Sequence, residues 1–160
     1  MFPESATIRP EPCVSPSTGE SFVPADVPGP AARCVLCIDD DSLNLELLQR
    51  VLQFRPDCEV LLATQGAAGI ELARRLKPDL IVLDLTLPDI SGEEVMQALR
   101  AEPQTARIPL MIVSGKVAAI CRQEDLRRAG ASVVLAKPFV IQEFLNALDQ
   151  LLCTGIPQAA

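Results

Sequence analysis

Five short apolar runs recur along the chain from about residue 33 onward, and charged residues, Gly or Pro bound each of them. The runs span residues 34–38, 58–63, 79–83, 108–113 and 132–136. Short runs that are rich in Leu and β-branched residues and apolar on both faces are typical of strands inside a parallel sheet. The pattern therefore predicts five buried strands.

Helical spacing of apolar residues fills the segments between these runs. After the first run, Leu47, Leu48, Val51 and Leu52 lie on one face of a predicted helix. After the last run, a second predicted helix has an apolar face made of Ile141, Phe144, Leu145, Leu148, Leu151 and Leu152. The segment 117–129 has a weaker stripe, because charged residues follow Val117, Ile120 and Cys121. We expect a loosely packed helix there.

Alternating strands and helices predict an α/β fold in which helices cover both faces of a five-stranded parallel sheet. Right-handed crossovers leave few topologies for such a doubly wound (βα)5 chain, and the flavodoxin-like strand order 2-1-3-4-5 suits five strands. We expect this domain to span residues 31–154. Residues 1–30, which hold seven of the 14 prolines, predict a disordered Pro-rich tail, and residues 155–160 a short C-terminal tail.

The composition narrows the chemistry that the chain can perform. Its 160 residues include no His, Trp or Tyr, and 21 acidic residues outnumber 14 basic ones, which gives a formal net charge of −7. A histidine base, a His-ligated zinc ion and a Ser-His-Asp triad are therefore excluded within this chain. The acidic balance, without a basic run, also argues against binding of nucleic acid.

The compartment and the state of the cysteines can also be predicted. The first residues lack the basic and apolar regions of a signal peptide, and no apolar stretch approaches the roughly 18 residues that cross a bilayer, so we expect a cytoplasmic protein without membrane contact. Cys34 and Cys37 lie in one predicted strand at a spacing that sends them to opposite faces. We expect the cysteines to be small buried hydrophobes rather than redox groups or metal ligands, with Cys13 and Cys153 the more reactive thiols.

Polar residues follow four of the five predicted strands, and in an open α/β sheet ligands bind beyond these carboxyl ends. The residues are Asp39, Asp40 and Asp41 after the first strand, Asp84 after the third, Ser114 at the end of the fourth and Lys137 after the fifth. Clustered carboxylates repel one another unless a cation offsets their charge, and oxygen ligands without His or Cys favour Mg²⁺. A metal, a lysine and a hydroxyl suit phosphoryl transfer, with a carboxylate as the best acceptor in a chain without histidine.

Each of these residues also has an ordinary structural interpretation. Asp41 or Ser42 suits the N-cap of the first helix, Asp84 suits a turn, and a lysine is most often solvated. It is the combination at one edge of the sheet, and not any single residue, that favours a site.

The residues at this edge lie in four motifs: Val-Leu-Cys-Ile-Asp39-Asp40-Asp41, Leu-Ile-Val-Leu-Asp84-Leu-Thr-Leu-Pro88-Asp-Ile-Ser-Gly92, Ile-Pro-Leu-Met-Ile-Val-Ser114-Gly115 and Gly130-Ala131-Ser-Val-Val-Leu-Ala-Lys137-Pro138-Phe139. In this order and spacing, residues 33–152 resemble the receiver domain of two-component response regulators. The resemblance implies a signalling phosphoacceptor, and not a conventional enzyme, that receives a phosphoryl group on Asp84 from a phosphohistidine of a sensor histidine kinase or histidine phosphotransfer protein. Because nothing follows residue 160, we expect a single-domain regulator whose output is a downstream target protein.

The resemblance also implies roles for individual residues. Asp39 and Asp40 match the acidic pair that holds Mg²⁺ together with Asp84 and the backbone carbonyl of Thr86, and Asp40 is the expected direct ligand. Ser114 and Lys137 match the hydroxyl and the lysine that pair with the phosphoryl group. The family also implies a cis Lys137-Pro138 bond, a loop after Asp84 shaped by Pro88 and Gly92, and an open path to the site at Gly115.

One position departs from the family pattern. Where the family often has Tyr or Phe three residues before the lysine, this chain has Val134. In the family that aromatic turns inward when the Ser or Thr moves, and it relays phosphorylation to the surface formed by the fourth helix, fifth strand and fifth helix. A receiver-fold interaction module that acts without phosphorylation is therefore a second interpretation. A third is a haloacid-dehalogenase-like phosphatase with Asp39 and Asp41 as its motif, although the further acidic pair expected after the lysine is missing.

Overall fold

A five-stranded parallel sheet forms the centre of the fold in the computed structural model, which describes residues 32–115 and 121–154. The strands lie in the order β2-β1-β3-β4-β5, and all neighbouring pairs are parallel. Their bounds are Arg33–Ile38 for β1, Cys58–Ala63 for β2, Leu80–Leu83 for β3, Leu110–Ser114 for β4 and Val133–Ala136 for β5. The predicted doubly wound, flavodoxin-like α/β fold is confirmed.

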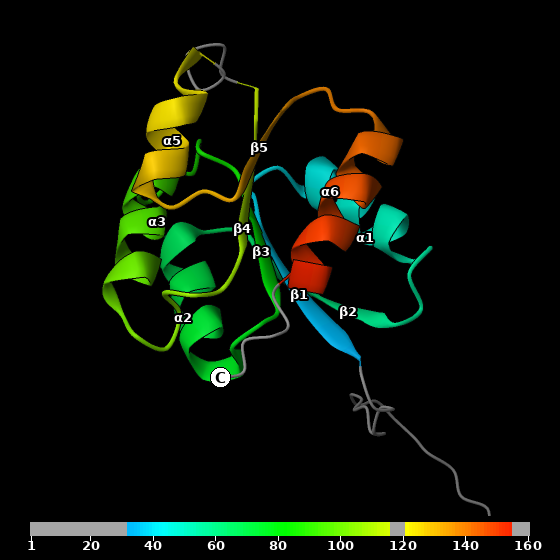
Figure 1. The fold of residues 1–160 in the computed structure, drawn as a ribbon, viewed down its shortest axis with the longest axis horizontal. Helices are drawn as coiled ribbons and strands as arrows, with labels where there is room; N and C mark the ends of the chain where they lie inside the picture. Colours follow the sequence, from blue (N-terminus) through cyan, green and yellow to red (C-terminus); the bar gives the residue numbers. More distant parts are fainter. Residues whose placement is uncertain (1–31, 116–120, 155–160) are drawn as a thin grey trace, which may run out of the picture. The chain divides into compact units, whose positions relative to one another are not determined.

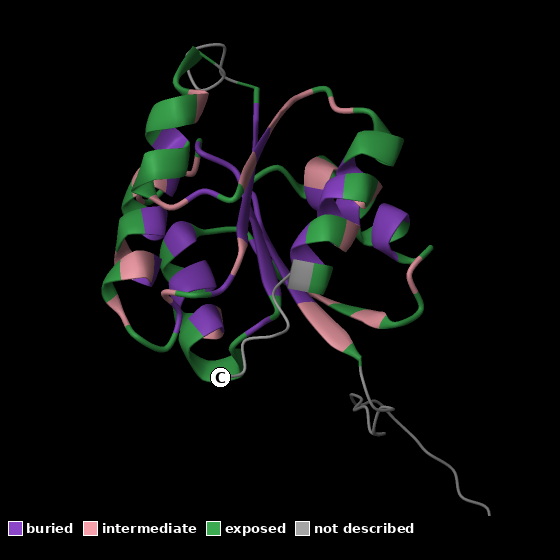
Figure 2. Ribbon diagram, in the orientation of Figure 1, coloured by how far each residue is buried: buried purple, intermediate pink, exposed green. Residues whose placement is uncertain are grey.

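Helices cover both faces of this sheet (Figure 1). Their bounds are Ser42–Leu52 for α1, Gly66–Leu76 for α2, Gly92–Ala101 for α3, Gln123–Ala129 for α5 and Ile141–Thr154 for α6. On one face α1 and α6 pack around Val35 and Phe144, and on the other α2, α3 and α5 pack around Leu36 and Met96. Successive side chains of β1 point to opposite faces, so each strand contributes to both cores. Figure 2 shows buried residues concentrated in the strands and on the helix sides that face them.

Two residues that the sequence places on buried helix faces are exposed instead. The buried stripe of α1 consists of Leu45, Leu48, Val51 and Leu52. Leu47 lies about 100° around the helix from Leu48, so a stripe that includes Leu45 turns Leu47 outward, and it is 41% exposed. On α6, Ile141 is 44% exposed, because the first turn of the helix, residues 141–143, lies in solvent before Phe144 reaches the core.

Of the helix predicted over residues 117–129, the structure describes residues 121–129, which include α5. Residues 116–120 lie outside the described part of the chain, and α5 begins only after Arg122, which caps the helix without a side-chain hydrogen bond. Leu126 is the buried residue of α5. Charged side chains occupy most of its other positions, which explains why so little of this helix packs against the sheet.

The two predicted tails, residues 1–30 and 155–160, lie outside the described residues. Within the described residues, none of the helices combines the length and the apolar character that a bilayer-spanning segment needs.

The end of α3 is tied to the segments around it by Arg100, which the sequence analysis does not single out. Its Nη2 donates to the carbonyl oxygen of Gly130 at 2.7 Å, and its Nη1 donates to the carbonyls of Ala106 at 3.0 Å and Ile108 at 2.9 Å. Burial lowers the pKa of Arg100. The guanidinium thus holds both the loop before β4 and the turn before β5 on the end of α3.

The prediction that the cysteines are buried hydrophobes holds fully for only one of the five described cysteines. Cys37 is buried in the core beneath α1 and α6, and Cys34 and Cys58 are partly buried. Cys121 and Cys153 are exposed. Cys121 lies just before α5, and Cys153 lies in the last turn of α6. Cys13 lies outside the described residues.

Alkylation with iodoacetamide at about pH 8 is expected to separate the buried thiols from the exposed ones. Burial, with the negative charges of Glu59 and Asp79, raises the pKa of Cys34 to about 11, and burial raises the pKa of Cys37 to about 12. Because only the thiolate reacts, about one thousandth or less of either group is reactive at this pH. Peptide mass mapping should find Cys121 and Cys153 modified first, and labelling of Cys37 at the same rate in folded protein would contradict the packing described.

Candidate functional site

The candidate site lies where the strands end, at the carboxyl edge of the sheet. Ile38 pairs with Leu83 at the ends of β1 and β3, and the Asp84 amide donates to the Ile38 carbonyl at 3.0 Å. This register places Asp39 beside Asp84. On the other side of β3, the Lys137 amide donates to the Ser114 carbonyl at 3.0 Å. Parallel pairing therefore brings together the residues that the sequence predicts at this edge.

Three carboxylates form a compact acidic cluster. One oxygen each of Asp39, Asp40 and Asp84 lies within 4.8 Å of the others. Asp39 and Asp84 are buried, whereas Asp40 is exposed. Close carboxylates repel one another, so the arrangement requires positive charge nearby.

Lys137 supplies part of this charge. Its Nζ donates to Asp39 Oδ2 at 2.8 Å and to Asp84 Oδ2 at 3.2 Å. Burial acts to lower the pKa of Lys137, but the hydrogen bond to Asp39 and the charge of Asp84 outweigh it, and the pKa is raised. The pKa of Asp84 is raised chiefly by burial and further by the charge of Asp39, although the Thr86 amide and Lys137 oppose the shift.

Backbone amides fix the orientation of the acidic side chains. Asp39 Oδ1 accepts from the Asp41 amide at 2.9 Å, and Asp84 Oδ1 accepts from the Thr86 amide at 3.1 Å. Asp41 itself points to the helix: its side chain accepts from the Leu43 amide at 2.9 Å and forms the N-cap of α1. The N-cap interpretation of Asp41 is confirmed, and this residue lies outside the cluster of three carboxylates.

The cluster suits a hard divalent cation. Its ligand atoms are carboxylate oxygens, and one ammonium group faces three carboxylates. Mg²⁺ prefers oxygen ligands and is commonly held by a few carboxylates together with water and phosphate oxygens. The donor set and the excess negative charge therefore fit this ion.

Four further residues that the sequence predicts for the site have definite places. Ser114 is buried at the end of β4, and Gly115 beside it is exposed. The Lys137–Pro138 peptide bond is cis. Val134 is buried in the core formed with α2, α3 and α5. Its carbonyl accepts a long, 3.5 Å hydrogen bond from the Gln123 side chain of α5.

The loop after Asp84 closes on itself and packs on α2. The Gly92 amide donates to the Leu85 carbonyl at 3.0 Å. Asp89, which sequence reasoning missed, accepts from the amides of Gly66 and Ala67 at 2.9 Å each. An Asp in a turn has an ordinary local explanation, so no signal in the sequence points to this contact with a helix 22 residues earlier.

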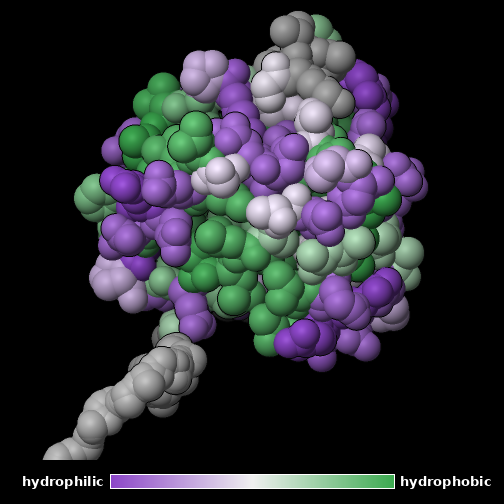
Figure 3. All heavy atoms as spheres, turned by 180° about the vertical axis from the view of Figure 1, so that it is seen from behind, coloured by the Kyte–Doolittle hydropathy of each residue, from purple (hydrophilic) through white to green (hydrophobic). Residues whose placement is uncertain are grey.

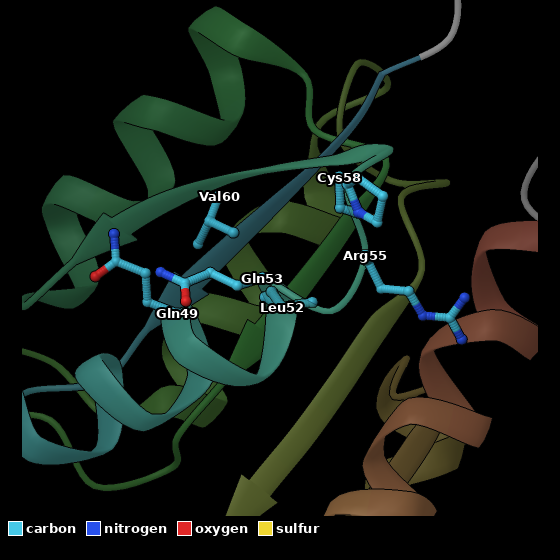
Figure 4. A pocket seen from close by; sticks show the side chains of 7 residues that line it. Gln49, Leu52, Gln53, Arg55, Cys58 and Val60 are labelled. Carbon is cyan, nitrogen blue, oxygen red and sulfur yellow. The ribbon is translucent and has the colours of Figure 1, made fainter.

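A separate hollow of about 270 Å³ lies between the end of α1 and β2, and Figure 4 shows its lining. Leu52, Cys58 and Val60 line it, together with the side chains of Gln49 and Gln53. Arg55 extends from its rim towards α6, where it pairs with Asp149. Cys58 is the first residue of β2, so the hollow lies at the opposite end of the parallel strands from the acidic cluster.

Comparison with known families identifies the class of protein. The family model described as the response regulator receiver domain matches residues 35–149. This match covers well over half of the chain, and the chain belongs to the response regulator receiver domain family.

Individual relatives agree with this assignment. The polar-differentiation response regulator DivK of Brucella anthropi is 28% identical over 120 residues, which cover 75% of this chain and 96% of DivK. The DNA-binding dual master transcriptional regulator RpaA of Synechocystis is 38% identical over 130 residues, which cover 79% of this chain; the chain spans about half (52%) of the length of that relative.

A solved receiver-domain structure shares the fold. The receiver domain of the sensor histidine kinase PA1611 from Pseudomonas aeruginosa was crystallised with a magnesium ion coordinated in its active-site cleft. It superimposes with a TM-score of 0.69 at 25% identity, covering 77% of this chain and 99% of that domain.

Proposed function

We propose that this chain accepts a phosphoryl group on Asp84 from the phosphohistidine of a partner, either a sensor histidine kinase or a histidine phosphotransfer protein. The observation that carries the proposal is the Lys137 ammonium, which bridges Asp39 and Asp84 at 2.8 and 3.2 Å inside an acidic cluster. A carboxylate nucleophile, an adjacent cation and a cluster that fits Mg²⁺ together suit phosphoryl transfer.

Asp39, Asp40, Asp84 and the backbone carbonyl of Thr86 would hold the Mg²⁺ ion. Asp40 is the best candidate for a direct ligand, because it is exposed, whereas Asp39 already accepts from Lys137 and from the Asp41 amide. When bound, Mg²⁺ supplies positive charge that offsets the carboxylates and the phosphoryl oxygens.

The side chains of the chain perform the transfer itself. An Asp84 carboxylate oxygen attacks phosphorus, the new O–P bond forms, and the P–N bond to the partner's histidine breaks with its electron pair returning to the imidazole. Lys137, which already contacts Asp84 Oδ2, neutralises a phosphoryl oxygen. The Ser114 hydroxyl donates to another. The chain thereby promotes only its own phosphorylation and dephosphorylation.

Exposed apolar side chains flank this site and would contact the partner. Leu43, 72% exposed, lies two residues after Asp41, and Val140, 59% exposed, lies three residues after Lys137. Leu47 on α1 and Ile141 at the start of α6 are exposed apolar residues as well. Figure 3 shows apolar side chains at the surface among polar ones on the rear face of the molecule. Exposed apolar groups beside a reactive centre suit a protein partner.

Phosphorylation would replace the singly charged carboxylate of Asp84 by a larger acyl phosphate that carries about one more negative charge, and so would bias a protein-binding surface on α5, β5 and α6. Val134 has no aromatic ring to swing inward, so the response would depend on Ser114. The same residue favours the alternative, an interaction module that acts without phosphorylation. In that case binding of a target protein would be unchanged by a beryllofluoride mimic of the phosphoryl group.

Incubation of the full chain with acetyl phosphate tests the proposed function. With Mg²⁺ present, intact-mass analysis should find a single phosphoryl group per chain, and removal of the ion with EDTA should prevent the modification, because the cluster then lacks its offsetting charge. A chain that stays unmodified with Mg²⁺, or that is modified equally in EDTA, contradicts the proposal.

A further inference from the structure

Helix α2 receives its N-terminal cap from a distant loop. The residue before it, Gln65, makes no side-chain capping bond. Instead, the Asp89 carboxylate accepts from the Gly66 amide through Oδ1 and from the Ala67 amide through Oδ2, each at 2.9 Å. The first amides of a helix lack partners within the helix, and its N-terminal end favours negative charge. Asp89 satisfies both needs from outside the helix.

The amides also keep this carboxylate charged. Hydrogen bonds from Ala67 and Gly66 lower the pKa of Asp89. The contact therefore favours the ionised form of Asp89, which is the form that accepts from both amides.

The first turn of α2 packs directly against the end of β1, which precedes Asp39, and against the loop that follows Asp84. A Cβ on Gly66 would lie 2.7 Å from Ile90 Cγ1, next to Asp89, and 2.7 Å from Val95 Cγ2. A Cβ on Gly69 would lie 2.4 Å from Ile38 Cδ1, next to Asp39. The two glycines thus allow α2 to approach the strand end that precedes Asp39 and the loop that follows Asp84.

Three sets of hydrogen bonds from backbone amides hold the loop from Asp84 to Gly92. The Thr86 amide donates to Asp84 Oδ1 at 3.1 Å, and the Gly92 amide donates to the Leu85 carbonyl at 3.0 Å. The third tie is Asp89 on α2, at the tip of the loop. The packing of Leu87 and Ile90 against the core adds to these hydrogen bonds, but Asp89 is the tie that fixes the tip to the end of α2.

We infer that Asp89 is a positioning residue for the phosphoryl-accepting site: by holding the loop tip on α2, it fixes the Thr86 carbonyl and Asp84 in the geometry that binds Mg²⁺. This inference rests on the proposed function. Asp89 acts through the loop, since the acidic cluster among the described residues consists of Asp39, Asp40 and Asp84. Residues that orient metal ligands typically change metal affinity by about 10- to 100-fold when they are lost.

Calorimetric titration of the full chain with Mg²⁺ tests this role. Asp89→Ala should weaken Mg²⁺ binding by about tenfold. Asp89→Asn, which keeps one acceptor oxygen, should show a smaller loss. The phosphorylation rate of Asp89→Ala with acetyl phosphate should fall at low Mg²⁺ and recover towards that of the wild type at saturating Mg²⁺.

Asp79→Ala provides a matched control. Asp79 Oδ2 accepts from the Cys34 amide at 2.7 Å, at the start of β3 and therefore at the far end of the sheet from the site. This variant also loses an amide–carboxylate bond but should keep the wild-type affinity for Mg²⁺. Equal affinities in the wild type and Asp89→Ala, or an equal loss in Asp79→Ala, overturn the inference alone. A wild-type chain that does not bind Mg²⁺ overturns the proposed function and this inference together.

Discussion

Replacing Asp84 with Asn is expected to abolish phosphorylation of the chain by acetyl phosphate in the presence of Mg²⁺. The amide is nearly the same size as the carboxylate and can still accept from the Thr86 amide, but it is uncharged and cannot form an acyl phosphate. Lys137 keeps its 2.8 Å contact with Asp39, so the partly buried ammonium is not left without a carboxylate. The variant should therefore remain folded while the modified species disappears from the mass spectrum.

Asp41→Asn is the matched control for this loss. Asp41 is the third acidic residue of the run, but its side chain caps α1 through the Leu43 amide. Asn is an equally good N-cap residue, so this variant should be phosphorylated like the wild type. Modification of Asp84→Asn at the wild-type level would place the phosphoryl group on another residue and contradict the assignment of Asp84.

The fold follows from the sequence because its determinants are periodic. Short apolar runs separated by helical spacing define five buried strands, and right-handed crossovers then limit how they can be ordered. The order of the sheet agrees with this prediction. The errors concern single positions on helix faces and the burial of the cysteines. Leu47 and Leu48 are both apolar, and only the packed structure shows that the stripe passes through Leu45 and leaves Leu47 exposed.

The acidic cluster is also foreseeable, since residues that follow parallel strands meet at one edge. The sequence cannot supply the contacts that order this edge. Asp89 accepts at this edge from amides more than 20 residues earlier, and at the opposite edge, before β4 and β5, Arg100 donates to the carbonyls of Ala106 and Gly130. Neither side chain belongs to a periodic pattern, and each has an ordinary local explanation. Such contacts depend on tertiary packing, which determines the position of each loop tip relative to a helix end.

Gly92→Ala is expected to destabilise the domain by about 3 kcal/mol, measured by urea unfolding. Gly92 is the first residue of α3, where Ala is intrinsically favoured over Gly by up to about 1 kcal/mol. We expect the steric clash to outweigh this preference and to lower the stability, because a Cβ at position 92 would lie 2.5 Å from the Asp84 carbonyl oxygen and 2.5 Å from Leu85 Cα. Both atoms belong to the backbone, so relief requires the loop that carries Asp84 to move. We therefore expect slower phosphorylation as well as lower stability.

Gly115→Ala is the control for Gly92→Ala, because it adds a methyl group beside the site without a steric clash. Its new Cβ would lie 3.8 Å from Lys137 Cβ, an ordinary van der Waals distance. Stability should therefore change by less than about 0.5 kcal/mol. A Gly92→Ala variant as stable as Gly115→Ala would mean that helix preference outweighs the contact with Asp84. In that case, the close approach of Gly92 to the backbone of Asp84 and Leu85 would not explain why position 92 holds a glycine.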